Sequence, residues 1–218
     1  QSRSSAASDV YKRQELRGFD KFTGIYTHVD SYWKVLPGCE IYRDSELFIG
    51  SDAVPTDPYA PDQEFHTTEF FTNVALDYID QACREPDDPF YLHLCYNAPH
   101  FPLEAPDELI DKYRGRYRKG WDQLRAEKLE RMQAMGIVPT SQTLPEAVGY
   151  DQEERKGFDF KPSVDSCGLP VWDTLSNSDQ EELDFRRSLY AAQVEHMDLN
   201  VGRLIDDLAK RGILDETL

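Results

Sequence analysis

The stretch PFYLHLCYNAPHFPLEAP, residues 89–106, is the strongest indication of how this 218-residue chain folds. Its first part, residues 89–96, is a short, nearly continuous apolar run rich in aromatic side chains, as in a strand buried on both faces of a parallel sheet. A loop follows, in which His100 stands between Pro99 and Pro102. Ligands bind in the loops at the carboxyl ends of such strands, and each proline fixes a backbone φ angle. We therefore expect this loop to aim one imidazole at a substrate.

The segments before this stretch predict the first half of an α/β core. Residues 68–83 carry apolar side chains at helical spacing behind a capping Thr68, which predicts an amphipathic helix. A turn at 85–89 then leads into the expected strand, so helix and strand together form half of an α/β unit. A further short strand is expected around residues 40–43.

The second half of the chain is predicted to be mainly helical. Residues 107–117 and 119–135 are expected to form two short helices. A capping box at 178–181 is expected to begin a long helix that runs to about residue 210, with Gly212 past its end. The predicted buried face of this helix holds Leu189, Ala192, Met197, Val201, Leu204, Ile205 and Leu208. Residues 137–170 are rich in proline, glycine and aspartate and predict a long loop.

The composition limits the possible classes of partner. The net charge is −17 and 39% of residues are hydrophobic, so the chain can bury one sizeable core but is a poor ligand for nucleic acid or an anionic membrane surface. No apolar run has the length of a membrane span. The four cysteines lack the spacing of a disulfide scaffold or a zinc ribbon. Cys95, inside the apolar run, is expected to be a small buried hydrophobic residue.

Several motifs, in a fixed order, resemble the sulfatase family, the formylglycine-dependent members of the alkaline-phosphatase superfamily. The first is the apolar run leading into Y-x-A-P-H-x-P-L-x-A-P at residues 96–106. The others are GFDKFTG at 18–24, TTEFFTNVALDYI at 67–79, YRGRY and GWD within 113–122, and MDLNVGRL at 197–204. The resemblance covers roughly residues 15–218. It implies an α/β fold, a partial alkaline-phosphatase-like fold with a central, mostly parallel sheet flanked by helices.

The resemblance also implies an activity, the hydrolysis of a sulfate monoester. In the family a calcium ion and basic residues hold the sulfate, and hydrated formylglycine attacks sulfur. The A-P-H histidine contacts a sulfate oxygen or protonates the departing oxygen, which makes His100 the candidate catalytic residue. Asn97, beside the loop, is a weaker candidate for substrate contact, because an asparagine at the end of a strand more often caps a turn. The implied location is periplasmic or secreted.

Other parts of the family's site are not found in this sequence. The nucleophile motif C/S-x-P/A-x-R, the early paired aspartates, the G-K-x-x-H segment and the D-N-G metal motif do not occur. Residues 215–218 resemble the D-x-T-L that stands shortly before D-N-G. We therefore expect an internal fragment of the catalytic domain that is inactive by itself. None of its residues is expected to bind the calcium ion or to become formylglycine.

The N-terminal residues predict a non-native tail. Residues 9–14, DVYKRQ, are what the bases GATGTGTATAAGAGACAG encode, a sequence that resembles a transposase end used to tag sequencing libraries. Residues 1–14 are then an adaptor-derived tail on a metagenomic fragment, and residues 15–218 are the native part. A native polar tail rich in serine and alanine is the alternative.

Some alternatives stay open at this point. A phosphodiesterase or phosphonate hydrolase of the same superfamily would share the A-P-H loop, and a non-catalytic sulfatase-like binding module would share the fold. The type of sulfate ester, small-molecule or carbohydrate, and the oligomeric state are also open. Of the other histidines, His93 is expected to pack in the core within the strand or to reach a helix face, and His196 to be solvated, while His28 and His66 have no supporting context.

Overall fold

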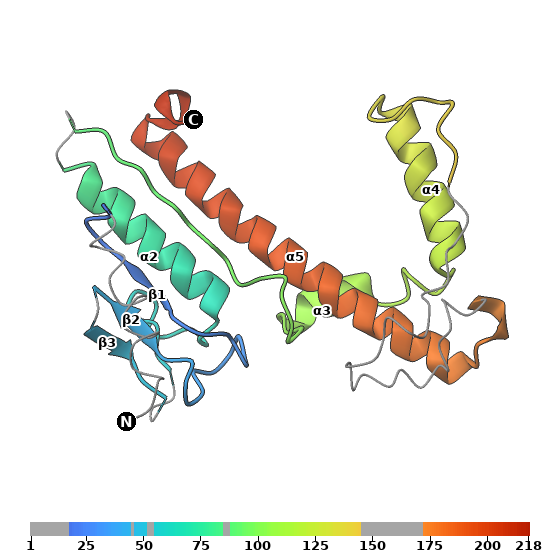
Figure 1. The fold of residues 1–218 in the computed structure, drawn as a ribbon, viewed down its shortest axis with the longest axis horizontal. Helices are drawn as coiled ribbons and strands as arrows, with labels where there is room; N and C mark the ends of the chain where they lie inside the picture. Colours follow the sequence, from blue (N-terminus) through green and yellow to red (C-terminus); the bar gives the residue numbers. More distant parts are fainter. Residues whose placement is uncertain (1–17, 45, 52–54, 85–87, 145–171) are drawn as a thin grey trace. The chain divides into compact units, whose positions relative to one another are not determined.

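A computed structural model describes residues 18–44, 46–51, 55–84, 88–144 and 172–218 (Figure 1). The chain divides into two compact units, which are described separately. The first unit comprises Gln1–Leu109 and Tyr190–Leu218, and the second comprises Ile110–Leu189. The expected tail at 1–14 and most of the loop expected at 137–170 lie outside the described residues.

A small antiparallel sheet forms one part of the first unit. Its strands β1 (Thr23–Ile25), β2 (Ile41–Arg43) and β3 (Glu46–Ile49) follow one another in the order β1-β2-β3. The register places Ile41 of β2 opposite both Ile25 of β1 and Ile49 of β3, so that three isoleucines lie side by side across the three strands. Ile41 and Ile49 are buried there. The strand predicted around residues 40–43 is confirmed as β2.

Helix α2 (Thr67–Ala82) packs on this sheet and confirms the helix predicted for residues 68–83. Phe70, Phe71 and Val74 are buried in one cluster with isoleucines of the sheet, because they repeat at helical spacing. The helix is capped by His66 and not by Thr68, since the Nδ1 atom of His66 accepts a hydrogen bond of 3.2 Å from the Thr68 amide. An imidazole nitrogen here satisfies one of the free amides of the first turn.

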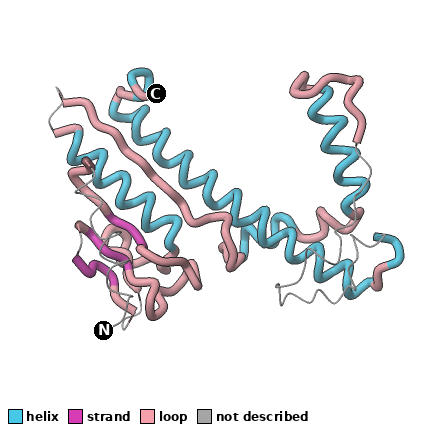
Figure 2. The backbone as a smooth tube through the Cα atoms, in the orientation of Figure 1, coloured by secondary structure: helices cyan, strands magenta, loops and turns pink. Residues whose placement is uncertain are grey.

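Residues 89–96 run back along α2 as an extended segment that forms no strand (Figure 2). The Tyr96 hydroxyl lies 2.7 Å from the Thr72 hydroxyl, and Leu94 and Tyr96 pack against the core cluster of the first unit. Exposure alternates along the segment, with Tyr91, His93 and Cys95 exposed and Leu92, Leu94 and Tyr96 partly buried. The segment thus has the two-residue period of a strand, with one face covered.

The expectation of a strand buried on both faces is therefore wrong for this chain, since Tyr91 is 76% exposed. Burial on both faces requires neighbouring strands that accept and donate the ladder hydrogen bonds. Among the described residues the three sheet strands pair antiparallel with one another, and none of them pairs with residues 89–96. The central parallel sheet is accordingly not seen, although the chain does combine helices with a sheet.

Helix α5 (Asn177–Arg211) is the long predicted helix. Its capping residue is Ser176, whose Oγ accepts a 3.1 Å hydrogen bond from the Asp179 amide, so the cap lies two residues before the box predicted at 178–181. The helix ends at Arg211, one residue beyond the predicted end, and Gly212 follows it as predicted, with a φ of 75° that suits a residue without a Cβ atom. A short 3₁₀ turn, η4 (Leu214–Glu216), follows.

The buried face of α5 differs from the prediction. Within the first unit its buried positions are Ala192, Gln193, His196 and Asn200, while Leu199, Val201 and Ile205 are exposed. Of the predicted apolar face, Ala192 alone is buried, and Met197, Leu204 and Leu208 are partly buried. The reason is that α5 meets a polar side of α2, where its side chains form hydrogen bonds with Glu69 and Asn73.

The second unit contains α4 (Trp121–Ala134), the 3₁₀ turn η3 (Trp172–Thr174) and the first part of α5. Helix α3 (Asp107–Tyr113), at the border of the two units, is shorter than the predicted 107–117, because Gly115 adopts a φ of 80°. The helices predicted for these regions are otherwise confirmed. No helix in the described part of the chain is long and apolar enough to cross a membrane.

The motif YRGRYRKGWD has a structural role in the second unit. The buried Asp184 carboxylate accepts hydrogen bonds from the amides of Gly115, at 2.7 Å, and Tyr117, at 2.8 Å. At Gly120 a Cβ atom would lie only 2.4 Å from Trp172, and φ is 82°, so both space and backbone conformation require glycine. The backbone of the motif thus packs closely against Asp184 of α5 and against the Trp172 ring.

Candidate functional site

The A-P-H loop is a compact turn that leaves His100 exposed. The His100 amide donates a 2.9 Å hydrogen bond to the Asn97 carbonyl, which closes a turn over residues 97–100. Ala98, inside this turn, is buried with Val29 and Tyr32. The peptide bonds before both prolines of the loop are cis. A buried alanine therefore fixes the turn while the histidine beside it faces outward.

The His100 ring is oriented by its own loop. Its Nδ1 atom lies 2.6 Å from the Phe101 carbonyl oxygen. Because a carbonyl oxygen can only accept, Nδ1 carries the proton in the neutral ring. The Nε2 atom then holds the lone pair, or a second proton when the ring is cationic. This arrangement leaves Nε2 as the atom that a substrate would meet.

Two side chains hold the backbone of this loop from outside. The Tyr32 hydroxyl donates a 3.0 Å hydrogen bond to the His100 carbonyl, and Gln193 of α5 donates to the carbonyls of His100 and Pro102 at 3.4 Å each. Burial raises the pKa of Tyr32 to about 12, so the phenol keeps the proton that it donates. Both anchors contact carbonyl groups of the loop and leave the imidazole exposed.

A third anchor is the Glu104 side chain just after the loop. One carboxylate oxygen accepts hydrogen bonds from the Ser31 hydroxyl, at 2.9 Å, and from the Tyr32 amide, at 2.6 Å. The connection between β1 and β2, which carries Ser31 and Tyr32, is thereby tied to the segment just after the A-P-H loop, in addition to the bond from the Tyr32 hydroxyl to the His100 carbonyl within the loop. Charge-assisted hydrogen bonds of this kind are among the stronger ones in proteins.

Two buried histidines lie close to these anchors. The rings of His66 and His196 are 4.5 Å apart, and the Nε2 atom of His196 lies 2.9 Å from a Glu69 carboxylate oxygen. Burial, with a smaller contribution from His196, lowers the pKa of His66 to about 3. The hydrogen bond from His196 lowers the pKa of Glu69. The expectation that His196 is solvated is wrong, because it is only 4% exposed.

This histidine pair predicts a loss of stability in acid. His66 stays neutral in the folded chain down to a pKa of about 3, whereas an unfolded histidine takes up a proton below about 6.5. The unfolded state therefore binds more protons between these values, and the free energy of unfolding should fall by about 2 kcal/mol from pH 7 to pH 5. Urea denaturation at a series of pH values measures this slope.

The matched variants for this test are His66→Asn and His93→Asn. Asparagine is a good capping residue, so His66→Asn keeps a cap on α2 while removing the titrating ring. This variant should lose the pH 7 to pH 5 slope, and His93→Asn, at an exposed position, should keep it. An unchanged slope in His66→Asn would contradict the assignment.

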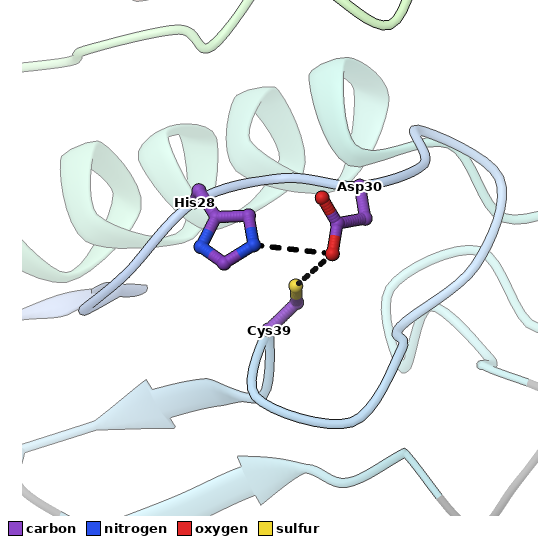
Figure 3. Close-up of side chains that lie close together, drawn as sticks. All are labelled: His28, Asp30 and Cys39. Carbon is purple, nitrogen blue, oxygen red and sulfur yellow. Dashed lines mark hydrogen bonds and ion pairs between the residues drawn. The ribbon is translucent and has the colours of Figure 1, made fainter.

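The connection between β1 and β2 also brings together His28, Asp30 and Cys39 (Figure 3). The Asp30 Oδ2 atom lies 3.1 Å from His28 Nε2 and 3.7 Å from Cys39 Sγ. Burial raises the pKa of the Cys39 thiol, which donates its hydrogen to Asp30. Neither His28 nor Cys39 was a candidate from sequence, although a histidine and an aspartate two residues apart in an extended segment lie on one face.

The family resemblance implies a calcium site, and the group formed by His28, Asp30 and Cys39 is the place to look for it among the described residues. Calcium binds six to eight oxygen atoms in proteins. Within the described ranges, the one group of three or more histidine, cysteine and acidic side chains at metal-binding spacing is His28, Asp30 and Cys39. This group offers nitrogen, sulfur and a single carboxylate, so it does not fit calcium.

The remaining residues singled out from the sequence, Asn97, His93 and Cys95, have few contacts beyond their own segment. The backbone carbonyl of Asn97 closes the turn of the A-P-H loop, and a contact of its side chain with substrate stays a prediction. His93 and Cys95 are exposed, and their Nε2 and Sγ atoms lie 3.1 Å apart. The expectations that His93 packs inside a strand and that Cys95 is buried are therefore wrong.

Comparison with known proteins gives consistent matches. A family model described as Sulfatase matches residues 4–218. The chain is 34% identical over 155 residues to a Schizosaccharomyces pombe protein described as an uncharacterized sulfatase, a match that covers 71% of this chain and 24% of that protein. It is 27% identical over 155 residues to an arylsulfatase of Klebsiella aerogenes, covering 71% of this chain and 29% of the relative. The chain thus spans about a quarter of the length of these relatives.

Proposed function

Because the chain belongs to the sulfatase family, we propose that the full-length protein hydrolyses sulfate monoesters and that His100 donates a proton to the departing ester oxygen. The observation that carries this proposal is the geometry of the A-P-H loop. His100 is exposed, its Nδ1 atom is engaged by the Phe101 carbonyl, and its Nε2 atom is left for a substrate. An imidazole so placed can act as a general acid through its Nε2 atom.

The role of His100 follows from the charge that develops during ester cleavage. When the bond between sulfur and the ester oxygen breaks, negative charge builds on that oxygen. A cationic His100 can donate the Nε2 proton to it, while the Nδ1 hydrogen bond keeps the ring in place. Tyr32 and Gln193 position the loop through its carbonyl groups and do not need to contact the substrate.

The nucleophile and the metal belong to the proposal for the full-length protein. No C/S-x-P/A-x-R motif occurs in residues 1–218, and the group formed by His28, Asp30 and Cys39 does not fit calcium. A formylglycine and a calcium ion, if present, are therefore expected in the remainder of the full-length protein, and residues 1–218 alone should show no turnover. The proton donation by His100 is accordingly the one step of the reaction that we assign to this part of the protein.

The parallel sheet is also part of the proposal. We place residues 89–96 as a strand of the sheet of the full-length protein, with neighbouring strands outside this chain. Support comes from the alternating exposure of the segment, in which Leu94 and Tyr96 pack against the core while Tyr91 and His93 are exposed. Extended backbone with this period is what a strand needs before its neighbours pair with it.

The proposed substrate is a small-molecule or carbohydrate sulfate ester. The net charge of −17 opposes binding of a polyanion such as nucleic acid, and an anionic ester would need a local positive site. A periplasmic or secreted location is proposed from the family.

Release of sulfate against release of phosphate tests this proposal. The full-length protein should release sulfate from an aryl sulfate, and should hydrolyse the matching aryl phosphate monoester and phosphodiester much more slowly. Residues 1–218 purified alone serve as the inactive control. Faster turnover of the phosphodiester would favour a phosphodiesterase of the same superfamily, and no turnover of any ester would favour a binding module.

A further inference from the structure

We propose that His28, Asp30 and Cys39 form a binding site for one borderline-soft divalent transition metal ion of the zinc type. The site lies on the connection between β1 and β2, on the surface of the first unit (Figure 3). It is separate from the imidazole of His100 and does not depend on the hydrolysis proposed above.

The spacing of the three donor atoms carries the proposal. The His28 Nε2, Asp30 Oδ2 and Cys39 Sγ atoms all lie within 4.8 Å of one another. In tetrahedral zinc sites with bonds of 2.0–2.3 Å, neighbouring donor atoms are roughly 3.3–3.8 Å apart. The separations of 3.1 and 3.7 Å from Asp30 Oδ2 to the other two atoms are close to this range.

The backbone explains why the three side chains converge. Val29, between His28 and Asp30, is buried with Tyr32 and Ala98, so its neighbours on either side are exposed and share one face. Cys39 reaches the same place from a turn in which its amide donates to the Leu36 carbonyl. Two separate parts of one connection thus present three ligands without any rearrangement of the core.

The chemistry of the donor set selects the ion. An imidazole nitrogen, a thiolate and a carboxylate suit zinc and related transition metals, whereas magnesium and calcium prefer oxygen ligands. In the metal-free chain Asp30 accepts hydrogen bonds from the other two side chains. On binding, the ion takes the place of these two hydrogens: the proton of the neutral His28 ring moves from Nε2 to Nδ1, and the Cys39 thiol releases its proton to solvent. Three protein ligands leave a fourth position open.

The ion would act as a clip on the connection between β1 and β2. Ser31 and Tyr32 lie between the ligands Asp30 and Cys39, and these two residues hold Glu104 and the His100 carbonyl. Fixing both ends of this segment therefore supports the anchors of the A-P-H loop.

Cobalt titration of residues 1–218 tests the site, because Co²⁺ takes zinc positions and a cobalt–thiolate bond gives a charge-transfer absorption band. We expect the band to saturate at one Co²⁺ per chain and to disappear when Zn²⁺ is added. A variant with Cys83, Cys95 and Cys167 changed to serine keeps only the Cys39 thiol and should keep the band. This variant also removes the exposed pair formed by Cys95 and His93.

Two ligand variants complete the test. Cys39→Ser should abolish the band. His28→Ala, at an exposed position that the fold does not need, should weaken Co²⁺ binding by more than the about 10–100-fold loss typical of partners outside the ligand shell. The proposal is overturned if wild type shows no band, if the band survives in Cys39→Ser, or if it is lost with the three other cysteines. Unchanged affinity in His28→Ala would also overturn it.

Discussion

Replacing His100 with alanine in the full-length protein should lower kcat for a sulfate ester with a poor leaving group by about 10²–10⁴-fold, the usual contribution of a general acid. The loss should be much smaller for an activated aryl sulfate. The reason is that a proton delivered to the departing oxygen matters most when that oxygen becomes a strong base. Steady-state kinetics with an alkyl or sugar sulfate and with a nitrophenyl sulfate measure both values.

The control for this variant is His93→Ala. His93 is an exposed histidine on the segment that leads into the same loop, and its ring contacts Cys95, not the loop. Its removal should leave kcat for both esters within a few-fold of wild type. Equal losses for the two esters in His100→Ala would instead place the imidazole on a non-bridging sulfate oxygen. No loss with either ester would make His100 structural.

Asp184→Ala should destabilise the second unit by about 3–6 kcal/mol, since it removes two hydrogen bonds to a charged group and each contributes about 1.5–3 kcal/mol. The buried carboxylate binds the amides of Gly115 and Tyr117, and alanine would leave both amides without their partner. Urea denaturation followed by the fluorescence of Trp121 and Trp172, in a Trp33→Phe background, reports on this unit alone.

Two further variants separate the hydrogen bonds from the charge. Asp184→Asn keeps one acceptor oxygen and should lose less stability than the alanine variant. Asp198→Ala removes a negative charge from an exposed position of the same helix and should change the free energy of unfolding by no more than about 0.5 kcal/mol. A loss of less than about 1 kcal/mol in Asp184→Ala would show that the two amides find other partners.

The helices could be predicted because their signals are local. Apolar spacing at Phe70, Phe71 and Val74 predicted α2, and the glycine at 212 predicted the end of α5. The helix caps were less predictable. His66 caps α2 where Thr68 was expected, and Ser176 caps α5 where the box at 178–181 was expected. Cap choice depends on which side chain reaches a free amide, and sequence spacing alone leaves several candidates.

The burial of residues 89–96 and of α5 could not be predicted from their own patterns. An apolar run shows that a segment is suited to a core, but not which other segments cover it. Leu199, Val201 and Ile205 are exposed on α5, while the polar Gln193, His196 and Asn200 are buried there. These polar side chains are buried because other segments offer hydrogen-bond partners: Glu69 on α2 bonds to His196, and carbonyl groups of the A-P-H loop accept from Gln193. A one-dimensional pattern does not contain such pairings.

The site was partly predictable. The A-P-H loop identified His100 as a candidate, and the structure adds the carbonyl that orients its ring and the anchors Tyr32 and Gln193. The buried pair formed by His66 and His196 was missed, because the two residues are 130 positions apart in sequence and meet only through the packing of α2 and α5.

The dependence of rate on the basicity of the leaving group is the most direct measurement of the central claim. kcat/KM should be determined for a series of substituted phenyl sulfates and alkyl sulfates with the full-length protein and its His100→Ala variant. A plot of log kcat/KM against the pKa of the leaving alcohol should be distinctly steeper for the variant, because it lacks the proton donor. Two parallel lines would contradict a role of His100 at the departing oxygen.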